Sequence, residues 1–288
     1  MIEGIAWVRR HSGDSVSDSR KWLLKAAVLL VAWGTVILPL MKWRYICGLA
    51  ILGLLGSLAA LAQSGGGTVG SDWRTASRAS IGIAPDPAVH PEPIIQVYAA
   101  RAVGWRGRFG VHSWIAAKPA NAIAFDVYEV IGWRSYNSLP AISVSNRPAD
   151  GRWFGNTPEL LADVRGDGVE EMILRLRTAV EAYPRGDTYT IWPGPNSNTF
   201  VAHLARALPE LRLDLPPTAI GKDFIPDSLI AATPSGTGYQ LSLFGLLGIL
   251  VAVEEGLEIN ILGLTFGIDP LDLALKLPFV GRLGPNGG

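Results

Sequence analysis

The stretch W-P-G-P-N-S-N-T-F (residues 192–200) decides how the second half of this chain folds. Its two prolines and its glycine exclude regular secondary structure over the first four residues. Asn196 and Ser197 then favour the start of a helix, and the pattern predicts a helix over residues 198–208 that ends at Pro209. At about 100° per residue, Ser197 falls near the middle of the apolar face of this helix.

The serine of this stretch, Ser197, is therefore the first candidate functional residue. A hydroxyl at a helix N-terminus lies beside free backbone N–H groups, where the helix dipole favours negative charge. A nucleophilic serine also needs a base to take its proton and donors to hold an oxyanion. Its neighbours Trp192, Asn196, Asn198 and Thr199 are predicted to contact a ligand. The simpler interpretation is that Asn196 and Ser197 only cap the helix.

Composition indicates a membrane-associated protein and excludes several other classes. The chain has 288 residues, ten tryptophans, only 17% charged residues and a positive mean hydropathy. Its 25 acidic and 25 basic side chains leave no basic surplus for phosphates, so nucleic acid is not an expected partner. The single cysteine, Cys47, excludes a disulfide framework and a thiolate metal cluster. The four histidines lack metal-binding spacing, and we expect neither a metal nor a cofactor.

The N-terminal part divides into a polar tail, residues 1–25, and two short apolar segments, residues 26–41 and 46–62. As helices the segments would reach roughly 24–26 Å, slightly short of a ~30 Å hydrocarbon core. Two short spans joined by a basic turn would leave the rest of the chain in the cytoplasm. Alternatively, an internal start at Met41 makes the second segment, residues 46–62, a secretory signal, or that segment is an uncleaved export anchor. We favour the second interpretation, a membrane-anchored or exported protein whose globular domain lies outside the cytoplasm.

A Gly/Ser/Pro-rich linker over residues 63–93 leads into a globular domain, residues 94–288. Two apolar segments near the C-terminus, residues 239–253 and 259–268, are too short to cross a bilayer. They predict a buried hairpin, with a re-entrant or membrane-surface element as the alternative. The other elements expected in the domain are strands over 94–100, 108–117, 124–133, 141–144 and 188–192, and a helix over 169–183. The expected fold class is α+β, a small antiparallel sheet packed by helices.

The central strands supply candidate partners for the serine. His112 is the only histidine on a predicted central strand, which makes it the candidate base. Glu129 belongs to an otherwise apolar strand face, and a buried carboxylate must find a partner or shift its pKa. In the functional interpretation Glu129 orients His112, with Asp126 and Tyr128 as weaker candidates for that role. In the structural one Glu129 pairs with an arginine among residues 101–108, and His112 is a packing residue.

Several stretches of this sequence resemble an uncharacterised family of bacterial membrane-associated proteins, a domain of unknown function. The resemblance covers about residues 72–285 and implies a membrane or exported bacterial protein without a known activity. The stretches are I-A-P-D-P (83–87), Q-V-Y-A-A-R (96–101), H-S-W-I-A-A-K-P (112–119), Y-E-V-I-G-W (128–133), W-P-G-P-N-S-N-T-F (192–200) and P-P-T-A-I-G-K-D (216–223).

A more distant resemblance is to the circularly permuted papain-like group, which includes NlpC-type and lecithin:retinol acyltransferase-like proteins. In that group a strand histidine comes first, a polar residue follows on the next strand, and an N-C-x-x-F motif opens a helix. Here His112, Glu129 and N-S-N-T-F from Asn196 follow in the same order. The resemblance implies Ser197 at the cysteine position and His112 as the base. The sequence departs from the group in offering a hydroxyl, whose pKa is far higher than that of a thiol.

Three functions remain open from the sequence. The leading expectation is a membrane-anchored papain-like domain that binds a cell-envelope lipid or peptide in a groove beside Ser197. The second is a serine-dependent amidase, lipid hydrolase or acyltransferase, with Ser197 as nucleophile, His112 as base and Glu129 as the orienting group. The third is a purely structural membrane protein in which Ser197 is only a helix cap. Membrane lipids are the expected surroundings in all three.

Overall fold

The computed structural model of this chain describes residues 73–284. The predicted tail over residues 1–25, both apolar segments (26–41 and 46–62) and the first part of the predicted linker lie outside the described residues. Among the helices within residues 73–284, none combines the length and the apolar character that a membrane crossing requires.

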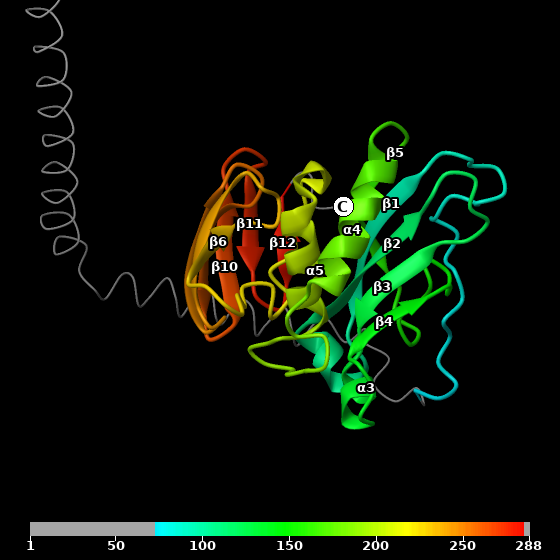
Figure 1. The fold of residues 1–288 in the computed structure, drawn as a ribbon. Helices are drawn as coiled ribbons and strands as arrows, with labels where there is room; N and C mark the ends of the chain where they lie inside the picture. Colours follow the sequence, from blue (N-terminus) through cyan, green and yellow to red (C-terminus); the bar gives the residue numbers. More distant parts are fainter. Residues whose placement is uncertain (1–72, 285–288) are drawn as a thin grey trace, which may run out of the picture. The chain divides into compact units, whose positions relative to one another are not determined.

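A five-stranded antiparallel sheet forms the first part of the domain (Figure 1). Its spatial order is β4-β3-β2-β1-β5. Four of these strands lie within three residues of the predicted bounds, whereas β5 is missing from the prediction. As an edge strand of half-exposed, mixed residues, β5 lacks the alternation of apolar and polar positions that marks a strand. The strands are β1 (Ile94–Arg101), β2 (Val111–Lys118), β3 (Asp126–Val130), β4 (Ile142–Ser145) and β5 (Glu159–Arg165).

Helices α4 (Val169–Glu181) and α5 (Ser197–Ala207) cover one face of this sheet (Figure 1). Their apolar sides pack with inward residues of β1 and β2, such as Val97 and Ile115, into the larger core. The opposite face of the sheet carries a second apolar cluster, which is rich in aromatic side chains. Because strand β2 has a core on each side, its residues are buried almost without interruption. Three short helices connect these elements: η1 (Gly104–Arg108), α3 (Gly132–Tyr136) and η2 (Pro209–Leu211).

The described end of the predicted linker, residues 73–93, is hydrogen-bonded to the domain. The backbone N–H groups of Ile83 and Ala84 donate to the carboxylate of Asp150, at 2.7 and 3.1 Å. The N–H of Arg152 donates to the carbonyl of Ala79 at 3.0 Å. This segment is therefore a structured border of the aromatic face.

The prediction of a strand over residues 188–192 is wrong, since the structure has an irregular loop there. The N–H of Thr190 donates to the carbonyl of Pro195 at 2.7 Å, which folds the loop back on itself. Pro193 and Pro195 have no N–H to donate, so the segment cannot extend a strand ladder. The indole of Trp192 instead donates to the carbonyl of Leu262 at 2.9 Å, and it thereby fixes the loop to the C-terminal sheet.

The C-terminal part is a seven-stranded antiparallel meander, in which each strand pairs with its neighbours in sequence (Figure 1). The buried hairpin predicted from the two apolar segments is therefore wrong. Residues 239–253 hold two strands, not one segment, because Phe244 and Gly245 turn the chain with positive φ angles of 53° and 70°. The strands are β6 (Ile230–Ala232), β7 (Gly238–Leu243), β8 (Leu247–Ala252), β9 (Gly256–Ile261), β10 (Leu264–Asp269), β11 (Ala274–Leu277) and β12 (Gly281–Leu283).

The inward face of this meander is polar and charged. Glu258 forms ion pairs with two buried lysines, Lys222 and Lys276, the latter at 2.9 Å. Lys276 also donates to Asp214 at 2.7 Å, and burial raises the pKa of that aspartate to about 6. Asp223 accepts hydrogen bonds from the side chains of β9 and β10. Every one of these buried charges has a partner, as burial of a charge requires.

Candidate functional site

The candidate site lies where two neighbouring strands of the five-stranded sheet diverge. Strand β2 pairs with β3 only from Ile115 to Ala117, whereas Glu129 and Val130 of β3 pair onward with β4. The first residues of β2, including His112, therefore have no β3 neighbour in the ladder. A cavity of about 230 Å³ lies at this opening, and both His112 and Ser197 line it.

His112, Glu129 and Arg147 form a buried chain of polar contacts beside the cavity. Nε2 of His112 lies 2.8 Å from Oε2 of Glu129, so the predicted partners are in hydrogen-bond contact. Arg147 holds the same carboxylate with two N–H groups, from Nε at 3.0 Å and from the terminal nitrogen at 3.2 Å. The arginine comes from the loop after β4, whereas the structural interpretation placed it among residues 101–108. Glu129 thus has both the histidine and an arginine as partners.

Aromatic rings pack against His112 and Arg147 and hold this set of polar contacts in place. The ring of Trp153 stacks on that of His112, with centroids 3.6 Å apart and planes 11° apart. Trp133 stacks in turn on Trp153 at 5.8 Å. The guanidinium of Arg147 lies 4.5 Å from the centre of the Trp114 ring. With its plane fixed by stacking and Nε2 fixed by Glu129, His112 has one free ring nitrogen, Nδ1.

The electrostatics of the pair favour a neutral histidine beside an ionised carboxylate. Burial lowers the pKa of His112 below its usual 6.5, although the hydrogen bond to Glu129 acts in the opposite direction. Burial also opposes ionisation of Glu129, but the contacts with His112 and Arg147 prevail and lower its pKa to about 2. With Nε2–H donating to the carboxylate, the unprotonated Nδ1 is the group that can accept a proton.

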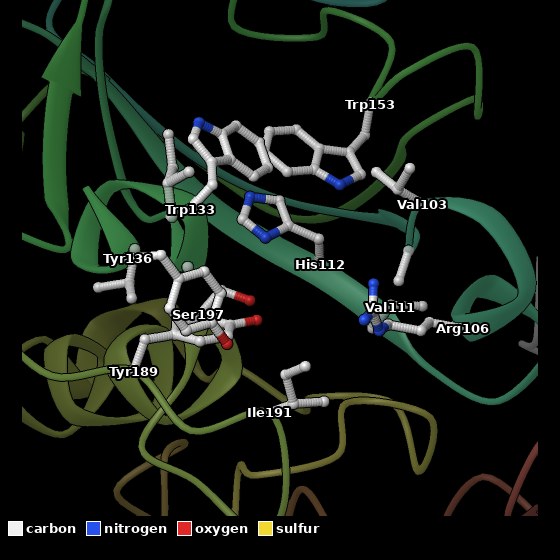
Figure 2. A pocket seen from close by; sticks show the side chains of 14 residues that line it. Val103, Arg106, Val111, His112, Trp133, Tyr136, Trp153, Tyr189, Ile191 and Ser197 are labelled. Carbon is white, nitrogen blue, oxygen red and sulfur yellow. The ribbon is translucent and has the colours of Figure 1, made fainter. Parts of the chain in front are cut away.

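Ser197 is the first residue of α5 and lies across the cavity from His112. Figure 2 shows the two side chains facing the same space, with one ring nitrogen of His112 on the side that holds Ser197. Both residues are described, and no direct hydrogen bond joins them. Ser197 is only 3% exposed, so its side chain borders the cavity rather than open solvent.

Asn196, not Ser197, is the residue that caps α5. The side-chain oxygen of Asn196 accepts from the N–H groups of Asn198 and Thr199 at 2.9 and 3.2 Å, and the hydroxyl of Thr199 accepts from the backbone N–H of Asn196 at 3.1 Å. Gly221 packs against this cap: its φ is +98°, and a Cβ there would lie 2.3 Å from Nδ2 of Asn196. The backbone N–H of Ser197 takes no part in the hydrogen bonds of this cap. The interpretation in which Asn196 and Ser197 cap the helix is therefore right for Asn196 and wrong for Ser197.

The other predicted ligand-binding residues serve the structure with their polar atoms. The amide of Asn198 donates to the carbonyls of Val111 and Ile220 at 3.0 and 2.8 Å, and its oxygen accepts from Ser113 at 2.8 Å. The hydroxyl of Thr199 donates to the carbonyl of Gly221 at 2.7 Å. These contacts lock the start of α5 to β2 and to the segment around residue 220. They position Ser197 rather than offering free donors.

A second cavity of about 360 Å³ begins on the other side of Ser197. It is lined mainly by apolar side chains, and Trp192, Asn196 and Asn198 belong to its wall. Arg106 is common to both cavities and brings a positive charge to their junction. The principal apolar residues in the wall of the second cavity are Trp105, Phe109, Ile220, Leu264 and Phe279. Ser197 thus lines both a smaller cavity that contains the imidazole of His112 and a larger cavity with mainly apolar walls.

Sequence reasoning missed several residues of this site. Arg147 and Trp153 belong to a turn-rich loop, residues 146–155, where no periodicity marks which side chains point inward. Leu264 and Phe279 come from the meander, which was not recognised. The available signal was a tryptophan and an arginine in a loop otherwise made of turn-forming residues.

Residues 92–224 match the family model described as "Protein of unknown function (DUF3750)". The predicted resemblance to a family of unknown function is confirmed over these residues, whereas the papain-like resemblance stays a prediction. The matched segment contains His112, Glu129, Arg147 and Ser197, and it ends just before the meander begins at Ile230. Comparisons with curated proteins and with solved structures gave no match.

Proposed function

We propose that this domain is a serine-dependent acyl hydrolase or acyltransferase, with Ser197 as the nucleophile and His112 as the base. One observation carries the proposal: His112 is held by Glu129 through Nε2, and its free Nδ1 faces a cavity that Ser197 also lines. A nucleophile, a base and a group that orients the base are the parts that acyl transfer by serine requires. We place the domain in a membrane-anchored protein of the bacterial envelope, as the apolar N-terminal sequence indicates.

In the proposed reaction Nδ1 of His112 takes the proton of the Ser197 hydroxyl as its oxygen attacks a carbonyl carbon. The N–H of Ser197, left outside the Asn196 cap, donates to the oxyanion that develops. His112 then gives its proton to the departing amine or alcohol, and an acyl-serine forms. Water or an acceptor alcohol repeats the sequence in reverse and frees the serine. Glu129 stays ionised throughout, which is consistent with its low pKa.

The order of elements supports a permuted papain-like arrangement for this site. The histidine strand β2 comes first, the Glu129 strand β3 follows, and the helix that begins at Ser197 comes last. In space, α5 packs on β2 and β3, which brings the start of the helix to the opening between them. The two-layer packing of α4 and α5 on an antiparallel sheet is compatible with that proposal.

Ligand binding without catalysis is the second candidate function. It is favoured by the absence of a direct hydrogen bond between Ser197 and His112, both within the described chain, and by the weaker nucleophilicity of a hydroxyl compared with a thiolate. Under this alternative the two cavities bind an envelope lipid or peptide that is not cleaved.

A fluorophosphonate probe tests the first function against the second. We expect the probe to modify Ser197, with peptide mass spectrometry identifying the labelled residue, because only a serine with an effective base reacts at a useful rate. The variant Ser197→Ala should lose the label, whereas Ser77→Ala, at an exposed serine of the 73–93 segment, should keep it. Wild-type protein that stays unlabelled while it binds lipid or peptide would favour the second function.

The pH dependence of labelling should show a plateau at neutral pH and an acid limb centred below pH 6.5. Labelling needs neutral His112, and burial lowers the pKa of this histidine, so the rate falls only as the pH drops through that lowered value. The pKa of Glu129 is lowered to about 2 in the folded protein. Its ionised carboxylate therefore stabilises the fold fully above pH 4.5, the pKa of this group in the unfolded chain, and that stabilisation is lost as the pH falls towards 2. Near-ultraviolet circular dichroism at each pH checks that the fold is intact. An inflection above pH 6.5 would contradict the assignment of His112.

A further inference from the structure

The outward face of the meander is apolar along its whole width. Strand pairing aligns its side chains in rows that cross the sheet, for example from Leu241 to Ile249 to Ile259 to Phe266. A second row joins Tyr239, Val251, Leu257, Ile268 and Leu275. Within strands β7 to β11 every outward position carries an apolar side chain, and none carries a charge.

This polarity is the reverse of that expected for a sheet bordering water. The inward positions carry the paired charges around Glu258, whereas outward Ile249 and Ile259 are 52% and 44% exposed. The exposed apolar area is on the order of 1,000 Å², above the ~300–600 Å² of the largest patch on a typical monomer. A one-residue register shift would bury the apolar set but expose the ion-paired one, so the register fixes which face points out.

The chain outside the structure indicates what covers this face. It includes two apolar segments, and the second ends at Ala62, eleven residues before the first described residue, Trp73. Eleven residues reach at most about 36–40 Å when extended. If residues 46–62 lie in a bilayer, the domain is confined next to its surface. A face without charges at its outward strand positions then lies within reach of lipid.

Aromatic side chains at one edge of the face fit the same surroundings. Phe244 occupies the turn between β7 and β8 and is 56% exposed. Trp192 is 50% exposed and is hydrogen-bonded to the turn between β9 and β10. The amphipathic indole of tryptophan is enriched at membrane–water interfaces, and the phenyl ring of Phe244 adds apolar surface at the same edge.

We propose that the outward face of the meander, strands β7 to β11, docks face-on to a lipid bilayer. The ladders satisfy the backbone polar groups of the sheet, so only apolar side chains enter the lipid. Leu264 lies on the outward side of β10 and also lines the apolar cavity beside Ser197, so docking brings that cavity to the lipid surface. The docking does not depend on catalysis by Ser197, and it adds a binding surface to the function proposed above.

Lipid-dependent quenching in the full-length protein tests this proposal. Single cysteines replace Ile249, Ile259 or Leu174 in a Cys47→Ser background, and each carries an environment-sensitive fluorophore. Leu174 is the matched control, because it is 54% exposed but lies on α4. The protein is reconstituted in phosphatidylcholine vesicles containing brominated lipid. We expect at least threefold stronger quenching at positions 249 and 259 than at position 174.

Two further measurements make the result decisive. Anionic lipid and added salt should leave the quenching at position 259 unchanged within twofold, because the outward strand positions have no charges for lipid headgroups to attract. Equal quenching at all three positions would overturn the proposal. If brominated lipid quenches neither position 249 nor position 259, the proposal is overturned, and aqueous iodide is used next. Protection from iodide would show that protein covers the face instead. Cross-linking between labelled copies would then identify a second copy of the chain as the cover, and a lack of cross-linking would identify the N-terminal segments. A labelled Val251→Cys variant replaces either probe position that fails to fold.

Discussion

Replacing Glu129 by glutamine is expected to slow phosphonate labelling of Ser197 by about 10³–10⁴-fold, the order of loss found when the carboxylate of a serine–histidine pair becomes an amide. The carboxylate accepts the Nε2 proton of His112 and leaves Nδ1 free to act as a base. The amide of glutamine can donate to Nε2 instead, which moves the ring proton to Nδ1. The histidine then faces Ser197 with the wrong tautomer.

The control for this variant is Glu92→Gln, because Glu92 also contacts a histidine, at 2.9 Å from Nδ1 of His90. That pair is about one-third exposed, and neither residue lines the two cavities beside Ser197, so the labelling rate of Glu92→Gln should stay within twofold of wild type. The rate constants come from labelling time courses at pH 7.5, with circular dichroism to confirm folding. A Glu129→Gln protein that folds and still labels at the wild-type rate would remove Glu129 from the mechanism.

Replacing Glu258 by alanine is expected to lower the free energy of unfolding by about 3–5 kcal/mol, the range for loss of one partner from a buried ion pair. Glu258 is 2% exposed, and it contacts both Lys222 and Lys276. Its removal leaves the buried ammonium groups of Lys222 and Lys276 with too little negative charge nearby to offset the free-energy cost of burying them. Urea unfolding followed by tryptophan fluorescence measures the change.

Glu254→Ala provides the matched control, since Glu254 belongs to the same meander but forms its ion pair with Arg212 near the surface. Its loss should cost less than about 1 kcal/mol, as is typical of exposed pairs. Equal destabilisation by the two variants would show that the charged inner face contributes no more than a surface pair. The comparison therefore measures what holds the inverted sheet in its register.

The sequence predicted those parts of the fold in which local pattern and burial agree. Strands β1 to β3 are rich in β-branched and aromatic residues, and α4 repeats apolar residues at helical spacing, so both were recognised. The break before Asn196 located the start of α5 to within one residue. Placing Glu129 on an apolar strand face led to its contact with His112, because a buried carboxylate needs a partner.

The parts that escaped prediction depend on contacts distant in sequence. Arg147 and Trp153 reach the site from an irregular loop, and only the folded chain shows that their side chains turn inward. The meander alternates with the expected period of two, but its apolar positions point outward. Interpreting residues 239–253 as one buried unit concealed the alternation of Gln240 and Ser242 with their apolar neighbours. Composition alone cannot show which side of a sheet faces the rest of the protein.

Four consecutive residues, 220–223, link the site to the meander through one backbone. The carbonyls of Ile220 and Gly221 accept from the side chains that fix the start of α5, while Lys222 and Asp223 anchor the inner face of the meander. Four residues span at most about 13–14 Å even when extended, so this connection has little length to spare. A shift of the meander relative to the five-stranded sheet must therefore pull on the residues that aim Ser197. Residues 220–223 are thus a direct covalent connection between the charged inner face of the meander and the residues that position Ser197.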